Sequence, residues 1–172
     1  MLKKDVEDAL NLQLNRETFS AYLYFSMAAW LNSQDLPGFS HWMVAQGMEE
    51  LTHAQKFYDY IQQRGGTVRL EAVAGPKAAW DSPLELFEET LDHEVFVTGS
   101  INSLVDTARD ASDHAAGIFL QWFVTEQVEE EESVGQVLQR LRRVGDNPSA
   151  LIMMDGELGK RMVTAPAATP AE

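Results

Sequence analysis

Four long stretches of the chain carry apolar residues at alternating steps of three and four, which is the spacing of one face of an α-helix. Glycine and proline are rare within these stretches, so the pattern predicts helices over about residues 4–33, 37–64, 82–109 and 114–143. Each helix would be about 40 to 45 Å long at a rise of 1.5 Å per residue. The short turns after the first and third helices predict two helical hairpins.

The connection between the two hairpins is long. Residues 65–81 hold three glycines and one proline and have no helical pattern, so we expect an extended crossover. Ser82, Pro83 and Glu85 then supply the N-cap, the first-turn proline and the capping-box glutamate of the third helix. This connectivity is that of a four-helix bundle with a crossover.

The predicted fold class is therefore all-α: an antiparallel four-helix bundle with one long crossover connection and a short fifth C-terminal helix. Residues 144–148 end the fourth helix and cap the fifth. We expect one domain over residues 1–163 and a disordered tail over residues 164–172, which consist of Ala, Pro, Thr and Glu. The alternative is a set of solvated helices that resemble a coiled coil, and the helix faces distinguish the two.

Each apolar face is interrupted near its middle by polar residues. In the third helix, the face reads Leu84, Phe87, Leu91, Glu94, Thr98, Ile101 and Val105. An unpartnered ionised carboxylate is costly to bury, so four of them, one from each helix at a similar level of the bundle, require a cation. The inward polar residues are Glu17, Glu50, His53, Glu94, Gln127 and Glu130.

These residues repeat between the two hairpins. A shift of 77 positions carries Glu17 to Glu94, Glu50 to Gln127 and His53 to Glu130. The hairpins therefore look like a degenerate repeat related by a pseudo-two-fold axis, although the rest of the sequence shows little self-similarity. The agreement of all three shifts supports one shared site.

Carboxylates with one imidazole and no sulfur form a ligand set suited to iron, manganese or zinc. Di-iron carboxylate bundles use a glutamate from each of two helices and a Glu-x-x-His motif from each of the other two. Here the second helix supplies Glu50-x-x-His53, whereas the fourth supplies Gln127-x-x-Glu130. We therefore predict an asymmetric pair of metal positions, the second of which binds more weakly.

The ligands would divide between these two positions. Glu17, Glu50 and His53 would hold the first ion, with Glu50 able to bridge. Glu94 and Glu130 would hold the second. The chain has no cysteine, which excludes thiolate zinc sites, iron–sulfur clusters and disulfides and agrees with an oxygen-rich centre.

Three neighbours of the ligands are interpreted as follows. Gln127 would hydrogen-bond the ligands, and Tyr24, two turns from Glu17 on the same face, would be a hydrogen-bond or electron partner. His93 is adjacent to Glu94 and therefore about 100° round the helix, so we interpret it as structural or interfacial.

The charge of the chain limits its partners. Its 172 residues include 27 acidic and 13 basic side chains, a net charge of −14, with a pI near 4.6. Such acidity opposes phosphate-rich partners, so we expect no nucleic acid. The N-terminus lacks the apolar stretch of a signal peptide, and no segment approaches the roughly 18 apolar residues of a membrane span. We therefore expect a cytoplasmic protein with no membrane partner.

The predicted site residues resemble those of a known protein family. Glu17, Tyr24, the run Glu49-Glu50-x-x-His53, Glu94 and the run Glu126-Gln127-x-Glu129-Glu130 resemble the ferroxidase centre of the non-haem ferritins of bacteria and archaea, over about residues 4–160. The resemblance implies a homo-oligomeric shell of 24 subunits that stores and detoxifies iron. It also implies two irons per subunit, oxidation of Fe(II) by dioxygen or hydrogen peroxide, and deposition of ferric oxide inside the shell.

The same likeness implies a third iron position and no haem. Glu49, Glu126 and Glu129, together with Glu130, match the third position of prokaryotic members. Haem-binding bacterioferritins carry a methionine directly after the glutamate of the first Glu-x-x-His, where this chain has Leu51. The alternatives are a ferritin-like di-iron oxidase without storage, a haem-free bacterioferritin-like protein, or a metal-stabilised structural bundle without turnover.

Overall fold

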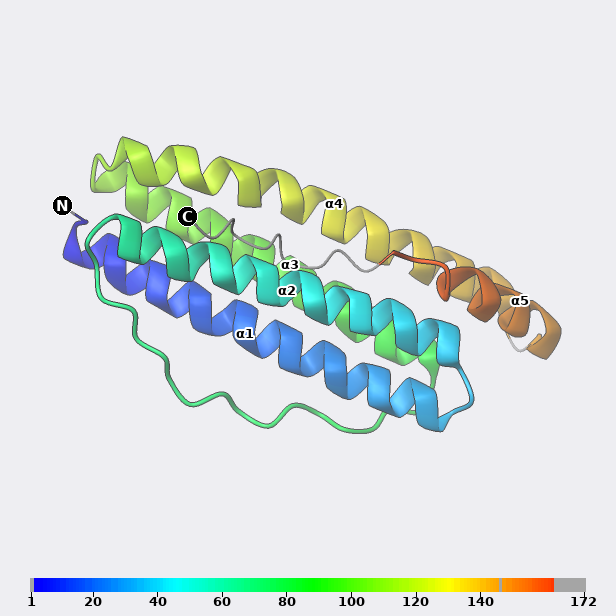
Figure 1. The fold of residues 1–172 in the computed structure, drawn as a ribbon. Coiled ribbons are helices and arrows are strands. Elements are labelled where there is room, and N and C mark those ends of the chain that lie inside the picture. The colour runs from blue at the N-terminus through cyan, green and yellow to red at the C-terminus, as the bar shows by residue number, and fades with distance from the viewer. Residues whose placement is uncertain (1, 146, 163–172) are drawn as a thin grey trace.

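The computed structural model describes residues 2–145 and 147–162, and these residues form five helices and no strand. The helices are α1 (Lys4–Ser33), α2 (Pro37–Gln63), α3 (Pro83–Asp110), α4 (His114–Val144) and α5 (Pro148–Leu158). Figure 1 shows the four long helices side by side in one elongated bundle, with α5 beside the end of α4. The predicted fold class is confirmed. The tail predicted at 164–172 lies outside the described residues.

Side-chain caps fix where three of the helices begin. The Ser82 hydroxyl accepts a hydrogen bond from the Glu85 amide (3.1 Å), as the sequence predicts for α3. Asp113 accepts from the Ala116 amide (3.0 Å) at the start of α4, and Asn147 caps α5 in the same way. Because a helix start sets which residues face inward, these caps help to fix the register of the polar layer described below.

The crossover runs along α1 (Figure 1) and is held there by two asparagines of that helix. Asn11 binds the carbonyl oxygen of Thr67 (3.0 Å) and the amide of Arg69 (2.6 Å). Asn15 binds the carbonyl oxygen of Arg69 and the amide of Glu71, both at 2.9 Å. The two side chains thus supply the partners that a neighbouring strand would give to extended backbone.

The buried apolar side chains form two clusters rather than one continuous core. Along α1, the buried members of one cluster end at Leu14 and those of the other begin at Leu23. Along α2, the corresponding gap lies between Met43 and Ala54. The predicted polar residues of these helices fall in the gaps, so a polar layer separates the two clusters. No helix among the described residues is long and apolar enough to span a membrane.

The predicted inward face of α3 is partly wrong. Its members Leu84, Leu91, Thr98 and Val105 are only half-buried. Packing rotates the helix so that their neighbours in sequence turn inward, while Glu94 stays at the centre of the face. The buried face passes through Leu86, Phe87, Thr90, Glu94, Val97, Ile101, Leu104 and Ala108.

Candidate metal centre

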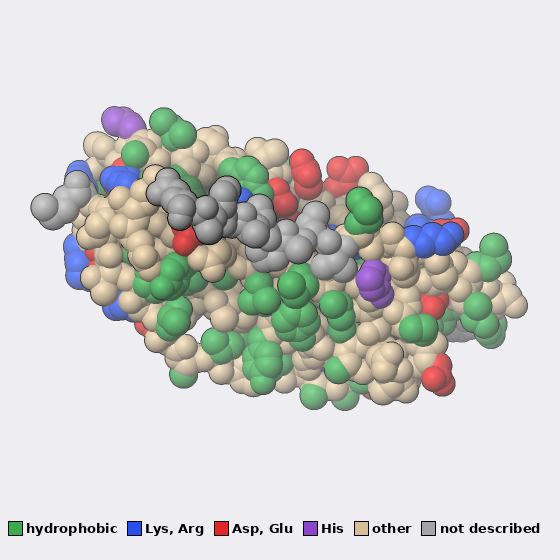
Figure 2. All heavy atoms as spheres, in the orientation of Figure 1, with side chains coloured by type: hydrophobic (Ala, Val, Ile, Leu, Met, Phe, Trp, Pro, Cys, Tyr) green, Lys and Arg blue, Asp and Glu red, His purple; other side chains and the backbone are tan. Residues whose placement is uncertain are grey.

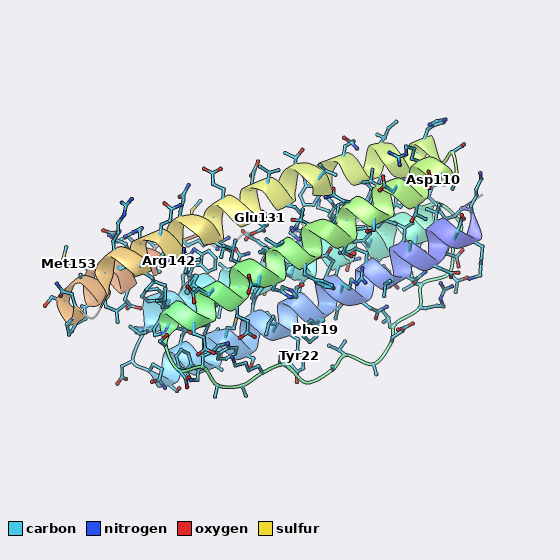
Figure 3. All side chains as sticks on the ribbon, turned by 180° about the vertical axis from the view of Figure 1, so that it is seen from behind. Phe19, Tyr22, Asp110, Glu131, Arg142 and Met153 are labelled. Carbon is cyan, nitrogen blue, oxygen red and sulfur yellow. The ribbon has the colours of Figure 1, made fainter. Side chains whose placement is uncertain are left out.

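The six predicted inward polar residues meet in the polar layer between the two apolar clusters. They come from all four long helices, and none has more than 4% of its surface exposed. Figure 3 shows how densely side chains fill the space between these helices. The residues of the layer are Glu17, Glu50, His53, Glu94, Gln127 and Glu130.

In the α1–α2 half of the layer, two carboxylates face one imidazole. The Nδ1 atom of His53 lies 3.4 Å from Glu50 Oε2 and 4.0 Å from Glu17 Oε2. Both of these oxygens are buried without a hydrogen-bond partner among the described residues. A buried acceptor left without a donor is costly, and a metal ion bound by both oxygens and Nδ1 removes that cost. The geometry fits the predicted first position.

In the α3–α4 half, protein groups already hold the carboxylates. The Tyr24 hydroxyl donates to Glu94 Oε1, and the Gln127 amide lies 3.3 Å from Glu94 Oε2. Glu130 Oε2 accepts from the Gln46 amide of α2 at 2.7 Å. Both acids predicted for the second position therefore lie in the layer, each with a neutral donor.

Burial changes the protonation of these acids. Desolvation and the nearby carboxylates raise the pKa of Glu17 and of Glu50 well above the usual range. Burial also raises the pKa of Glu94 and of Glu130 to about 7. A cation that binds in the layer must therefore displace protons from acids that hold them near neutral pH.

The imidazole of His53 and the phenol of Tyr24 respond differently to burial in the layer. Burial lowers the pKa of His53, but the surrounding carboxylates, Glu126 foremost, outweigh it and raise the pKa overall. Burial and the charge of Glu94 raise the pKa of Tyr24 well above its usual value, so Tyr24 stays a phenol that donates to Glu94. Tyr24 is thus placed to position one acid of the layer.

The acids of the predicted third position are spread over the edge of the layer. Glu126 Oε1 lies 3.8 Å from His53 Nε2, and the ligand atoms of His53, Glu126 and Glu130 all lie within 4.8 Å of one another. Glu49 instead receives a hydrogen bond from Arg161 (2.5 Å). Figure 2 shows acidic side chains near the middle of α4, and Glu129, which lies in that region, is exposed. The structure thus brings Glu126 to the centre and leaves Glu129 outside it.

Two glutamines of the layer were not assigned to the site from the sequence, although Gln46 was placed on the inward face of the second helix. Gln13 donates to Glu17 Oε1 at 2.7 Å and accepts from Ser100, and Gln46 donates to Glu130. Gln46 occupies the inward face of α2 one turn before Glu50, which is a signal that the spacing alone contains. Gln13 is found only once α3 is packed against α1, because Ser100 is its partner.

His93 turns away from the carboxylates, as predicted. Its Nε2 lies 2.8 Å from the Ser20 hydroxyl, and its ring meets the ring of Tyr24 edge to face at 5.8 Å. Burial lowers the pKa of His93 to about 4, so the ring is neutral. It packs behind Tyr24, and its hydrogen-bond partner is Ser20.

The fold and the site define a four-helix bundle with a buried carboxylate and imidazole layer that could hold a metal ion, and comparison with known proteins identifies the family. Residues 7–144 match the ferritin-like domain family. The chain is 40% identical over 161 residues to the bacterial non-heme ferritin of Staphylococcus aureus, covering 94% of this chain and 97% of that protein. It is 36% identical to the bacterial non-heme ferritin of Bacteroides fragilis, again over 94% of this chain. The chain belongs to the ferritin family.

Solved structures agree with this assignment. An engineered closed form of Archaeoglobus fulgidus ferritin superposes with a TM-score of 0.94 at 47% identity and covers 95% of this chain. The open-pore ferritin of the same archaeon gives a TM-score of 0.93 at 47% identity. Together with the five helices, these matches confirm the ferritin-like bundle.

Proposed function

We propose that this protein stores and detoxifies iron by oxidising Fe(II) to Fe(III) in the polar layer. The iron would then be deposited as ferric oxide inside a hollow homo-oligomeric shell, for which we propose 24 copies. The observation that carries the proposal is a pair of buried carboxylate oxygens, one of Glu17 and one of Glu50, beside His53 Nδ1; within residues 2–145 and 147–162 neither has a hydrogen-bond partner. Membership of the ferritin family supports it.

In this proposal, Fe(II) is the substrate of the centre. Glu17, Glu50 and His53 bind the first ion, and Glu94 and Glu130 bind the second. Each Fe(II) gives up one electron, so two ions reduce one dioxygen to hydrogen peroxide, with uptake of two protons, or one hydrogen peroxide to two waters. The carboxyl protons displaced when iron binds offset part of this uptake.

The remaining residues act on this reaction indirectly. Gln127 and Tyr24 hold Glu94, and the Tyr24 phenol is in direct hydrogen-bond contact with this acid of the second position. Glu49, Glu126 and Glu129, with Glu130, would form a third position. Oxidised iron would pass from the paired positions to this third position on its way to the interior of the shell. We propose that no haem, nucleic acid or membrane takes part and that the protein acts in the cytoplasm, in keeping with its net charge of −14.

Mixing purified apoprotein with Fe(II) in air tests the proposal. A storage ferritin oxidises many irons per subunit and keeps them in solution with the protein. A di-iron oxidase without storage stops near two irons per subunit, and a structural bundle oxidises none faster than buffer. Electron microscopy of the loaded protein then tests the shell, because retained iron without a hollow assembly contradicts storage as we propose it.

A further inference from the structure

Arg161, which follows α5, lies against a predicted ligand of the third position. Its Nη2 donates to Glu49 Oε2 at 2.5 Å, and the two side chains are only 21% and 20% exposed. A charge-assisted hydrogen bond in such a partly buried setting is stronger and less screened than one in open water. The guanidinium therefore occupies one oxygen of a carboxylate that we propose as a metal ligand, and its positive charge would repel a metal ion bound there.

Both the main chain and the side chain of Arg161 are held on α2. The carbonyl oxygen of Arg161 accepts a hydrogen bond from His41 Nε2 at 2.8 Å. The guanidinium carbon lies 4.4 Å from the centre of the Trp42 ring, a cation–π contact. Trp42 and Glu49 are seven residues apart, so they lie on one face of α2, two turns from each other. Arg161 lies along that face.

The packing of α5 against the start of α2 determines where the segment that carries Arg161 begins. Asp155 of α5 accepts hydrogen bonds from the Gly38 amide (2.8 Å) and the Phe39 amide (2.9 Å), and so caps the first turn of α2. A Cβ atom on Gly38 would lie 1.8 Å from the Asp155 carbonyl oxygen, so the helices can approach this closely only at a glycine. The chain therefore leaves α5 from a fixed point beside α2.

One end of the guanidinium is not satisfied. The Nη1 atom of Arg161 is buried without a hydrogen-bond partner among the described residues. An arginine with a purely structural role would use both ends of its planar fork, because an unmet buried donor is costly. Here the charge of Glu49 and the Trp42 ring hold the side chain in place. A cation on Glu49 removes the first of these attractions.

We infer that Arg161 is a displaceable counter-charge that competes with metal ions for Glu49 and keeps the third position weak. The inference rests on the proposed function, because it requires Glu49 to bind iron at the third position. When iron binds Glu49, the guanidinium leaves the carboxylate while the main chain stays on His41. Iron then leaves the third position readily, since Arg161 returns to Glu49.

Anaerobic calorimetric titration with Fe(II) tests this inference on the full-length protein. In Arg161→Gln, the binding step assigned to the third position should tighten roughly tenfold, the change expected when one charge-assisted hydrogen bond no longer competes. The two tighter steps should stay unchanged. Arg161→Lys, which keeps the charge, should return the third step toward the wild-type value. Glu49→Gln should lose that step.

Arg140→Gln is the matched control, because Arg140 pairs with Glu157 of α5 and not with the centre. If Arg140→Gln tightens the third step as much as Arg161→Gln does, loosening of α5 explains the effect and the inference is wrong. The inference also fails if Glu49→Gln loses a third step that Arg161→Gln leaves unchanged, although the third position then stands. If wild type, Glu49→Gln and Arg161→Gln all show the same two steps, both the third position and the inference fail.

Discussion

The two hairpins place polar residues at matching positions, yet their carboxylates have different partners. In the α1–α2 half, Glu17 and Glu50 each keep one buried oxygen, within 4.0 Å of His53 Nδ1, that accepts no hydrogen bond from the part of the chain that the structure describes. In the α3–α4 half, Glu94 accepts hydrogen bonds from a phenol and from the amide of Gln127. A metal ion finds an open oxygen on both acids of the first half, whereas in the second half both oxygens of Glu94 and one oxygen of Glu130 already accept hydrogen bonds.

The difference shows that equal spacing does not give equal affinity. An ion entering the α1–α2 half gains ligands without breaking a protein hydrogen bond. An ion entering either half must displace protons, because burial raises the pKa of all four acids. An ion entering the α3–α4 half must in addition compete with the neutral donors that hold Glu94 and Glu130. The α1–α2 half should therefore fill first. The sequence predicts the same order, because the fourth helix has Glu130 where a second histidine ligand would stand.

Removing a ligand from the α1–α2 half should have the largest effect. His53→Ala or Glu50→Ala should slow Fe(II) oxidation by at least about 100-fold, because each removes a proposed ligand of the first ion: the imidazole nitrogen of His53 or the open carboxylate oxygen of Glu50. Stopped-flow absorbance of Fe(III) formation measures the rate. Glu132→Ala, an exposed acid of α4, is the control. If both variants oxidise iron at the wild-type rate, the ligand assignment is wrong.

The α3–α4 half should make the apoprotein less stable as the pH rises. Burial raises the pKa of Glu94 and Glu130 to about 7, so the folded chain binds more protons than the unfolded chain between about pH 4.5 and 7. The stabilisation is complete below about pH 4.5 and is lost as the pH rises through about 7. A shift of this size corresponds to roughly 3 kcal/mol for one isolated acid, and the losses from two interacting acids do not simply add. Melting temperatures across this range measure the loss of stability.

Glu94→Gln provides the control for that prediction, because the amide does not titrate. The melting temperature of this variant should fall less between pH 6 and pH 8 than that of wild type. A variant with the wild-type slope would show that Glu94 does not hold a proton in the folded protein.

Removing a donor from the α3–α4 half should have a moderate effect. Gln127→Leu should slow oxidation about tenfold, because Glu94 loses an amide that orients it toward the second position. The affinity for the first Fe(II), measured by anaerobic calorimetry, should not change. Gln136→Leu, on the exposed side of α4, should leave both quantities at their wild-type values. A loss of first-ion affinity in Gln127→Leu would contradict the division into halves.

The smallest effect is expected from Tyr24→Phe. Glu94 keeps its Gln127 partner, so loss of the phenol should slow oxidation only about threefold, which is less than 1 kcal/mol in the barrier. Tyr22→Phe is a close control, since Tyr22 lies on α1 with 51% of its surface exposed (Figure 3). A much larger loss in Tyr24→Phe would indicate that Tyr24 supplies an electron and does more than hold Glu94.

Much of the fold follows from local signals in the sequence. The helices lie within one or two residues of their predicted bounds, because proline, glycine and cap residues such as Ser82 mark the ends. All six inward polar residues were found because their spacing is helical. The face of α3 was predicted less well, because apolar residues such as Leu91 and Val105 lie at its half-buried edge, where helical spacing does not distinguish them from fully buried neighbours.

What the sequence did not reveal depends on contacts between distant segments. The hydrogen bonds by which Asn11 and Asn15 hold the crossover join residues more than fifty positions apart. Arg161 contacts Glu49 from near the other end of the chain. No periodic pattern encodes such pairs. Their partners become visible only after the helices have packed.

The division of the buried apolar side chains into two clusters also has a consequence for motion. Each cluster can hold its own end of the bundle, and the polar layer between them contributes less apolar burial. Amide hydrogen exchange should therefore be slowest in the helix segments of the two apolar clusters and faster in the polar layer, the waist of the bundle between them. An ion could then enter through brief openings of the waist while both ends stay folded.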